Sequence, residues 1–113
     1  MSGWRILPFT ADHIDSVLRI EQDLFPTPWG YDSFVNELSC RDSYSYIAAP
    51  NQSGNNTAAV GYICFRILFD EMHLMKIGVA RNRQHKGIAT YLFQNSMKIA
   101  LEKGTSTVYL EVR

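Results

Sequence analysis

Two spacings of hydrophobic residues divide this 113-residue chain into strands and helices. Alternating apolar and polar residues, or short apolar runs between turn residues, predict strands. Five such segments occur: Trp4–Phe9, Tyr44–Ala49, Ala58–Leu68, Met72–Ala80 and Thr107–Val112. Apolar residues three or four positions apart predict three helices, which begin at Thr10 or Asp12, at Tyr31 or Asp32, and at Gly87, and end near Leu24, Leu38 and Lys103. The order β-α-α-β-β-β-α-β predicts an α/β fold (α+β with a mixed sheet), ending in a parallel, right-handed strand-helix-strand unit.

Prolines and glycines mark the connections between these elements. The segment Phe25-Pro26-Thr27-Pro28-Trp29-Gly30 cannot continue a helix, because each proline lacks an N–H group and restricts the residue before it. It is therefore predicted to form a rigid aromatic loop. Residues 50–57 are turn-forming and predict a hairpin between the second and third strands. Gly78 interrupts the fourth strand and indicates either a bulge or a close approach by another backbone or a ligand.

Composition narrows the class of protein. The length fits one domain, and with 46% hydrophobic and 19% charged residues the chain is typical of a globular protein. No apolar run approaches about 18 residues, which argues against a membrane span, and no secretory pattern opens the chain, so a cytoplasmic location is expected. Eleven basic residues balance eleven acidic ones, which argues against direct nucleic-acid binding. Cys40 and Cys64 are expected to be reduced structural thiols, with no metal site.

The stretch from Met72 to Leu101 carries the clearest chemical signal. A strand runs into the polar turn Gln84-His85-Lys86-Gly87-Ile88-Ala89, which opens a helix. Unpaired backbone N–H groups and the positive end of the helix dipole meet at such a point and favour an anion. The spacing fits neither a P-loop nor a dinucleotide-binding glycine motif. On this motif alone, a phosphate site and an ordinary crossover with a glycine turn are both open.

Several segments together resemble one family. Gln84-x-x-Gly87-x-Ala89 resembles the acetyl-CoA pyrophosphate loop of the GNAT N-acetyltransferases. The ribosomal-protein-alanine (RimI) type of that family is similar in three further segments, in the same order along the chain. These are Phe25-Pro26-x-Pro28-Trp29 followed by Phe34, Asp70-Glu71 before Leu74-x-x-Ile77-x-Val79, and Leu110-Glu111-Val112-Arg113. The resemblance implies a GNAT fold with acetyl-CoA as co-substrate.

The resemblance also implies a role for particular residues. The backbone of Ile77, Gly78 and Val79 would pair with the pantetheine arm, and Gln84 would begin the cofactor loop. The pyrophosphate would lie on the backbone of His85, Lys86, Gly87, Ile88, Ala89 and Thr90, with the charge of Lys86 nearby. Four aromatic-loop and neighbouring residues would line the acceptor groove: Phe25, Pro28, Trp29 and Tyr31. Ala89 stands where many relatives have glycine.

Glu111 is the residue that matches the family's catalytic base. A base is useful because an α-amino group with a pKa of about 8 is mostly protonated at neutral pH. Its apolar neighbours would desolvate the carboxyl group and raise its pKa. Without the resemblance, Glu111 would be read as the solvent-facing residue of an edge strand. Glu71 and His73 offer an alternative proton relay through water, His85 is expected to contribute its backbone, and His13 is expected to be solvated.

The resemblance stops short of the whole family pattern. The family continues with an asparagine that holds the cofactor, a helix bearing the tyrosine thought to protonate the thiolate, and two more strands. Residues 1–113 are therefore expected to be one C-terminally truncated GNAT domain. Such a domain would bind acetyl-CoA weakly and transfer slowly or not at all, and its exposed final strand favours a homodimer.

The leading hypothesis is acetyl transfer to the N-terminal α-amino group of a protein, such as a ribosomal protein. Two alternatives remain: a non-catalytic acyl-CoA-binding or interaction module derived from such an enzyme, and a small-amine or lysine acetyltransferase. The sequence does not identify the acceptor.

Overall fold

The computed structural model describes residues 3–51 and 58–110. Within them the predicted element order is confirmed, with two short 3₁₀ turns added. The elements are β1 (Trp4–Pro8), η1 (Ala11–His13), α1 (Ile14–Leu24), α2 (Tyr31–Ser39), β2 (Ser43–Pro50), β3 (Gly61–Leu68), β4 (Glu71–Val79), η2 (Arg81–Arg83), α3 (Ile88–Glu102) and β5 (Thr107–Leu110). Most of the predicted hairpin turn lies outside the described residues, and so does the predicted end of the last strand.

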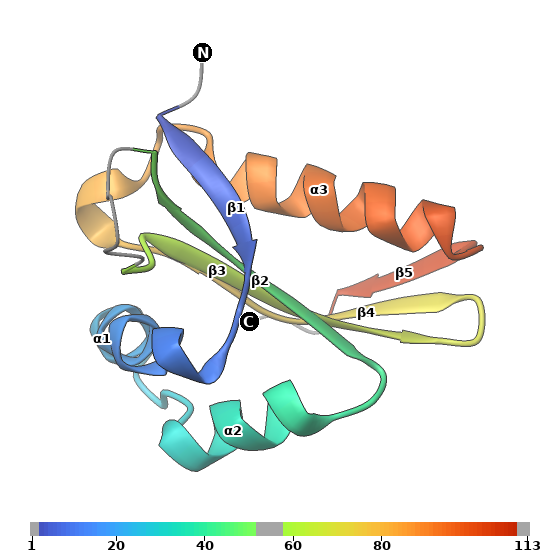
Figure 1. Ribbon diagram of the computed structural model, residues 1–113, viewed down its shortest axis with the longest axis horizontal. Coiled ribbons are helices and arrows are strands. Elements are labelled where there is room, and N and C mark those ends of the chain that lie inside the picture. Colours follow the sequence, from blue (N-terminus) through green and yellow to red (C-terminus); the bar gives the residue numbers. More distant parts are fainter. Residues whose placement is uncertain (1–2, 52–57, 111–113) are drawn as a thin grey trace.

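The five strands form one mixed sheet in the order β1-β2-β3-β4-β5. The first four strands are antiparallel to their neighbours, and β5 runs parallel to β4 after the crossover through α3. The sheet separates two helical layers: α3 covers one face, and α1 and α2 cover the other (Figure 1). The strand-helix-strand unit that the sequence predicts is therefore present, and it places the turn before α3 at the end of β4.

Each face of the sheet has its own hydrophobic core. Under α3 the buried residues are Ala48, Ile63, Phe65, Met72, Leu74, Val79, Ile88, Leu92 and Ala100. Under α1 and α2 they are Phe9, Ile14, Val17, Ile20, Phe34, Ile47, Ala49, Ala59, Tyr62 and Cys64. The alternation of side chains along β2 and β3 sends successive residues into opposite cores. Both cysteines are free thiols, as predicted.

Local sequence explains where the helices begin and end. The helix α1 ends at Leu24 because Phe25 precedes a proline and adopts an extended conformation, with φ −117° and ψ 133°. The helix α3 ends before Gly104, whose φ of +85° continues the chain in the left-handed region. The Thr105 N–H group then donates to the carbonyl oxygen of Ala100 at 3.0 Å. Lys103 is thus the C-cap residue, and Gly104 after it ends the helix.

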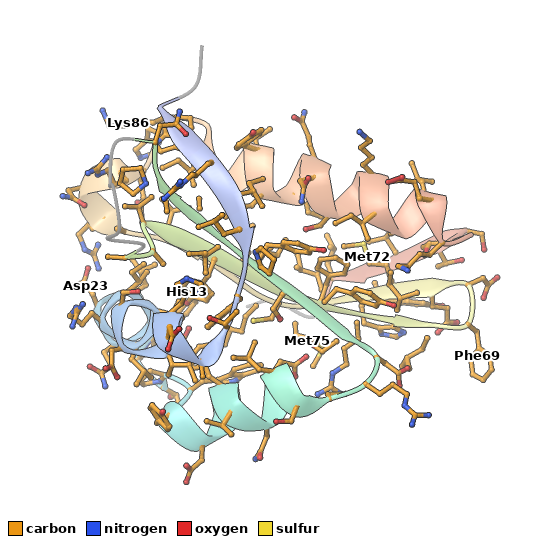
Figure 2. The ribbon with its side chains drawn as sticks, in the orientation of Figure 1. His13, Asp23, Phe69, Met72, Met75 and Lys86 are labelled. Atoms are coloured by element: carbon orange, nitrogen blue, oxygen red, sulfur yellow. The ribbon has the colours of Figure 1, made fainter. Side chains whose placement is uncertain are left out.

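His13 is buried, so the expectation that it would be solvated is wrong. It lies on the inner side of the turn that leads into α1, facing the sheet (Figure 2). Its Nδ1 atom accepts a hydrogen bond from the Thr10 N–H group at 3.0 Å, and its ring contacts Phe9 edge-on at 6.3 Å. Burial lowers the pKa of His13, with a smaller opposing effect from the charge of Asp12. The short 3₁₀ turn rotates this residue inward, which the helical spacing of the sequence did not indicate.

A β-bulge in β4 divides the strand into two parts. Cys64 pairs with Lys76 but its neighbour Phe65 pairs with Leu74, so Met75 is an extra residue in β4. Met75 packs into the core under α1 and α2, whereas Met72 lies on the α3 side (Figure 2). The bulge therefore falls at Met75 and not at Gly78, where the sequence had suggested it as one possibility.

The pairing of β4 with β5 is described for the first part of β4 only. The pairing of β5 with β4 extends from Glu71 opposite Thr107 to Leu74 opposite Leu110. Within the described residues no strand pairs with that side of β4 from Met75 to Val79. The strand thus presents an open edge directly before the turn that leads to α3.

Candidate functional site

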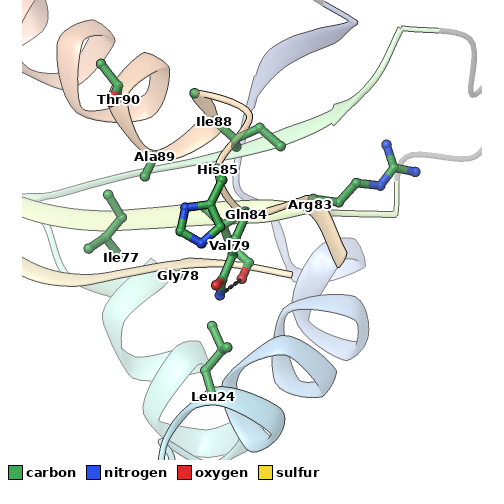
Figure 3. Close-up of a pocket in the computed structure, with 11 residues that line it drawn as sticks. Leu24, Ile77, Gly78, Val79, Arg83, Gln84, His85, Ile88, Ala89 and Thr90 are labelled. Atoms are coloured by element: carbon green, nitrogen blue, oxygen red, sulfur yellow. Dashed lines mark hydrogen bonds between the residues drawn. The ribbon is translucent and has the colours of Figure 1, made fainter. Parts of the chain in front are cut away.

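A pocket of about 350 Å³ lies at this open edge, between the end of β4 and the start of α3 (Figure 3). Its lining contains nine of the ten residues predicted to bind a cofactor: Ile77, Gly78, Val79, Gln84, His85, Gly87, Ile88, Ala89 and Thr90. The tenth, Lys86, is exposed and does not line the pocket. The structure thus brings together two stretches that the sequence linked only by resemblance.

Backbone groups of β4 that point away from β3 face the pocket. The carbonyl oxygen of Val79 accepts a hydrogen bond from Gln84 Nε2 at 3.1 Å, across the open edge (Figure 3). Backbone hydrogen-bonding groups alternate in direction along an antiparallel strand. Val79 and, two residues earlier, Ile77 therefore direct their N–H and C=O groups away from β3. Gln84 uses its side chain to fasten the turn to the strand.

The turn before α3 exposes the first backbone N–H groups of the helix. His85 and Gly87 have positive φ angles of 64° and 86°, and Gly87 caps α3 without any side-chain hydrogen bond. The N–H groups of the first helical turn have no carbonyl partner inside the helix. Ile88, Ala89 and Thr90 form this turn and line the pocket. The arrangement provides several donors and a positive dipole end for an anionic group.

Two pocket residues escaped the sequence analysis. Leu24, the last residue of α1, lies opposite the turn, and Arg83 also lines the pocket, although its side chain extends away from the other lining residues (Figure 3). The basic residues between Arg81 and Lys86 were the one sequence feature that could have indicated Arg83. Arg81, at the start of the turn, binds Asp23 near the end of α1. Its Nε atom lies 3.1 Å from Asp23 Oδ2, and its Nη2 donates to the Asp23 carbonyl oxygen at 2.8 Å. The end of α1 is thus tied to the start of the turn.

The aromatic loop, residues 25–30, lies beside the same end of α1. Phe25 and Trp29 are half-buried, whereas Pro28 and Tyr31 are exposed. Trp29 packs against Phe34 of α2 with ring centroids 5.2 Å apart. The predicted acceptor residues therefore divide into two that anchor the loop and two that face outward.

A buried polar cluster underlies the loop, and the sequence analysis missed it. Glu21 is fully buried, and its carboxylate accepts hydrogen bonds from the Tyr62 hydroxyl and from the Trp29 N–H group at 2.9 Å. Lys76 Nζ lies 2.6 Å from Glu21 Oε2. Burial, with the contact to Glu21 adding to it, raises the pKa of Tyr62 far above its ordinary value, so that its hydroxyl remains a donor. Helical spacing indicates only that Glu21 is a polar position. Its partners Tyr62 and Lys76 lie on strands that are far away in the sequence, so its burial could not be predicted.

Among residues 3–51 and 58–110, no group of three or more His, Cys, Asp or Glu side chains is arranged to hold a metal ion. In the same part of the chain, no helix is both long and apolar enough to cross a membrane.

A family model described as "Acetyltransferase (GNAT) family" matches residues 14–113. The chain belongs to this family. It is 28% identical over 102 residues to a Bacillus subtilis protein provisionally named ribosomal protein bS18-alanine N-acetyltransferase, covering 90% of this chain and 65% of the relative. It is 30% identical over 115 residues to an N-alpha-acetyltransferase of Saccharolobus solfataricus, covering 90% of this chain and 66% of the relative. The chain thus spans slightly less than two thirds of either protein.

Solved GNAT structures share the fold. The ribosomal-protein-S18-alanine N-acetyltransferase of Escherichia coli matches with a TM-score of 0.84 and 20% identity, covering 97% of this chain and 67% of that one. Arabidopsis thaliana NAA60, solved in complex with acetyl-CoA, matches with a TM-score of 0.77 and 18% identity, covering 95% of this chain and 73% of that one. The mixed sheet with helices on both faces is therefore a GNAT fold, as the sequence predicted.

The predicted base of this GNAT chain, Glu111, lies outside the described residues, so its role stays a prediction. The alternative pair, Glu71 and His73, lies on the part of β4 that pairs with β5. His73 Nε2 is 3.1 Å from Glu71 Oε1, and the His73 ring stacks on Tyr109 of β5 with centroids 4.9 Å apart. Both side chains are partly exposed, at 20% for His73 and 40% for Glu71. The two side chains therefore form a hydrogen-bonded pair, and neither of them lines the pocket.

Proposed function

We propose that this chain transfers the acetyl group of acetyl-CoA to an amine, and that the amine is the N-terminal α-amino group of a protein. The observation that carries the proposal is the pocket where the open edge of β4 meets the N-terminus of α3. Membership of the GNAT family supports the reaction type. The names of the two curated relatives support an α-amino acceptor.

The pocket suits the shape and chemistry of acetyl-CoA. Its volume of about 350 Å³ falls within the range of about 300 to 1,000 Å³ that is usual for ligand sites. The amide groups of the pantetheine arm would pair with the backbone groups of Ile77 and Val79 that point away from β3, as an added strand would. The pyrophosphate would accept hydrogen bonds from the first N–H groups of α3, with Arg83 and Lys86 supplying positive charge.

The reaction requires a neutral amine and a leaving thiolate. The amine nitrogen attacks the thioester carbonyl carbon, and the tetrahedral intermediate collapses as the bond to sulfur breaks. The nitrogen loses a proton, the CoA sulfur gains one, and the products are an amide and CoA. We assign Glu111 as the base that takes the amine proton, with the Glu71 and His73 pair as the alternative route through water.

Binding and transfer are tested by two measurements on the same chain. Isothermal titration with acetyl-CoA measures cofactor binding. A thiol-release assay measures transfer to peptides that begin with Ala, Ser, Met or Gly and to a peptide whose only free amine is a lysine side chain. Transfer to the α-amino peptides is expected. Transfer only to the lysine peptide would mean that the acceptor is a lysine side chain and not an N-terminal α-amino group. Acetyl-CoA binding without any transfer would favour a non-catalytic acyl-CoA-binding module, and absence of binding would overturn the proposal.

The variant Glu111→Gln separates chemistry from binding. It keeps the size of the side chain and removes its basicity, so transfer should fall by about 100-fold or more while the acetyl-CoA affinity is unchanged. Unchanged transfer would exclude Glu111 as the base. In that case His73→Gln, which breaks the alternative relay, becomes the decisive variant.

A further inference from the structure

One buried glutamate holds both ends of the aromatic loop. The backbone carbonyl oxygen of Glu21 accepts the N–H group of Phe25 at 3.0 Å, where the loop begins. The side-chain Oε2 of Glu21 accepts the N–H group of Trp29 at 2.9 Å, near where the loop ends. Between these two bonds lie the prolines that keep the segment out of a helix. The loop is thus closed on a single residue of α1.

Lys76 connects this clamp to the strand that lines the pocket. It directly follows the bulge residue Met75 and directly precedes Ile77, the first pocket residue of β4. Its ammonium nitrogen lies 2.6 Å from Glu21 Oε2, 4.0 Å from the ring centroid of Phe25 and 5.4 Å from that of Trp29. The side chain is only 13% exposed. Both aromatic rings of the loop therefore rest on one cation from β4.

We propose that Glu21 and Lys76 are positioning residues that fix the aromatic loop relative to β4 and thereby set how tightly the acceptor amine is held beside the thioester. The inference rests on the proposed function and on the prediction from the sequence that the aromatic loop lines the acceptor groove. It goes beyond that function by naming an ion pair whose two side chains do not line the pocket and which controls the acceptor side only.

Energetics favour a positioning role over a purely structural one. A buried ion pair contributes little net stability compared with apolar residues of the same size, since both charges lose their hydration. Here the pair makes two contacts to loop rings and one to a loop N–H group, so the position of the loop depends on the position of the pair. Removing only the ammonium group should free the rings of Phe25 and Trp29 while the pocket backbone stays in place.

The same face of the sheet contains a matched ion pair that does not touch the loop. Glu37 of α2 is buried, with its Oε1 atom 2.6 Å from Arg66 Nη2 and its Oε2 atom 3.1 Å from Arg66 Nε. It also joins a helix to a strand. Because the Arg66 side chain is 35% exposed, variants of this pair report what losing a partly buried helix-to-strand ion pair does in general.

The experiment compares Lys76→Met, Lys76→Arg and the double variant E21Q/K76M with wild type and with the control E37Q/R66M. The probes are CoA and a bisubstrate conjugate in which an acetyl group links the CoA sulfur to the α-amino group of a peptide beginning with alanine. For Lys76→Met and E21Q/K76M, the affinity for the conjugate and the acceptor KM should each worsen by about tenfold, the effect of losing one charged contact. The affinity for CoA should be unchanged. Lys76→Arg, which keeps the charge and can stack on the rings, should restore most of the loss.

The outcomes separate the two proposals. Wild type that binds neither CoA nor the conjugate would overturn the proposed function, and the acceptor role with it. Wild type that binds the conjugate no more tightly than CoA would overturn the acceptor role of the loop. Equal losses in E21Q/K76M and E37Q/R66M, or a loss of CoA affinity in Lys76→Met, would show that the pair is merely structural. The double variant guards against misfolding of the single one, because it leaves no unpaired charge buried.

Discussion

The side chain of Tyr62 fills the space that a Cβ atom would need at Gly78. A Cβ atom built at Gly78 would lie 2.7 Å from the Tyr62 hydroxyl oxygen and 2.8 Å from two ring carbons. Tyr62 is fully buried and is held by its hydrogen bond to Glu21, so it cannot easily move aside. The close approach at Gly78 is therefore made by a tyrosine side chain from the neighbouring strand, whereas the sequence suggested another backbone or a ligand.

Gly78→Ala should lower the free energy of unfolding by about 1 to 3 kcal/mol, because the added methyl group overpacks a rigid site. Chemical denaturation of the variant measures this directly. Gly3→Ala is the control, since nothing lies within 4 Å of a Cβ atom there and its stability should be close to that of wild type. If Gly78→Ala is as stable as Gly3→Ala, Tyr62 is more mobile than its contacts indicate.

Local signals were sufficient for the order of elements and for the region of the pocket. The proline-rich loop stops α1, Gly104 stops α3, and the turn from Gln84 to Ala89 opens α3, and each follows from the preferences of a few adjacent residues. The parallel pairing of β4 and β5 also follows from the length of the helical crossover between them. These features need no knowledge of distant contacts.

Features that depend on partners far apart in the sequence were not predictable. Glu21 has the polar character of a surface position, and only the approach of Tyr62 and Lys76 from two strands makes its burial possible. The bulge at Met75 likewise arises from register between β3 and β4. Hydrophobic period alone cannot place an extra residue in a strand whose two faces are both buried.

The stability of the protein should depend on the protonation of His13. Burial lowers its pKa in the folded state below the ordinary value of about 6.5, and the neutral ring accepts the Thr10 N–H group. The unfolded chain therefore binds the proton more readily, so the contribution of His13 is fully present above about pH 6.5 and declines as the pH falls towards the folded-state pKa. Denaturation at a series of pH values measures this decline.

The variant His13→Asn isolates that contribution. Asparagine keeps an acceptor near the position of Nδ1 but does not titrate, so the part of the decline that begins near pH 6.5 should disappear. Carboxylates elsewhere will still reduce stability at lower pH in both proteins. An identical pH profile for variant and wild type would mean that His13 is not the source.

The two cysteines should differ sharply towards thiol reagents. Cys64 is fully buried, and burial raises the pKa of its thiol to about 12, so it forms almost no thiolate at pH 8. Cys40 follows α2 and is partly exposed. A disulfide reagent should therefore titrate one thiol in the native protein and two in denaturant, and Cys40→Ser should remove the native reaction. Rapid native labelling of Cys40→Ser would show that the core under α1 opens readily.

Gly87 and Gly104 offer a test of whether the turn before α3 binds acetyl-CoA. Both residues have nearly the same positive φ, 86° and 85°, and both have open space where a Cβ atom would lie. Alanine at either position should destabilise the fold by about 1 kcal/mol through backbone strain alone. Only Gly87 lines the pocket, so Gly87→Ala should also weaken acetyl-CoA binding several-fold by shifting the N–H groups of the first turn, whereas Gly104→Ala should not. Isothermal titration compares the acetyl-CoA affinities of the two variants, whose stabilities should match. Equal affinities would mean that the pyrophosphate does not bind at the turn before α3.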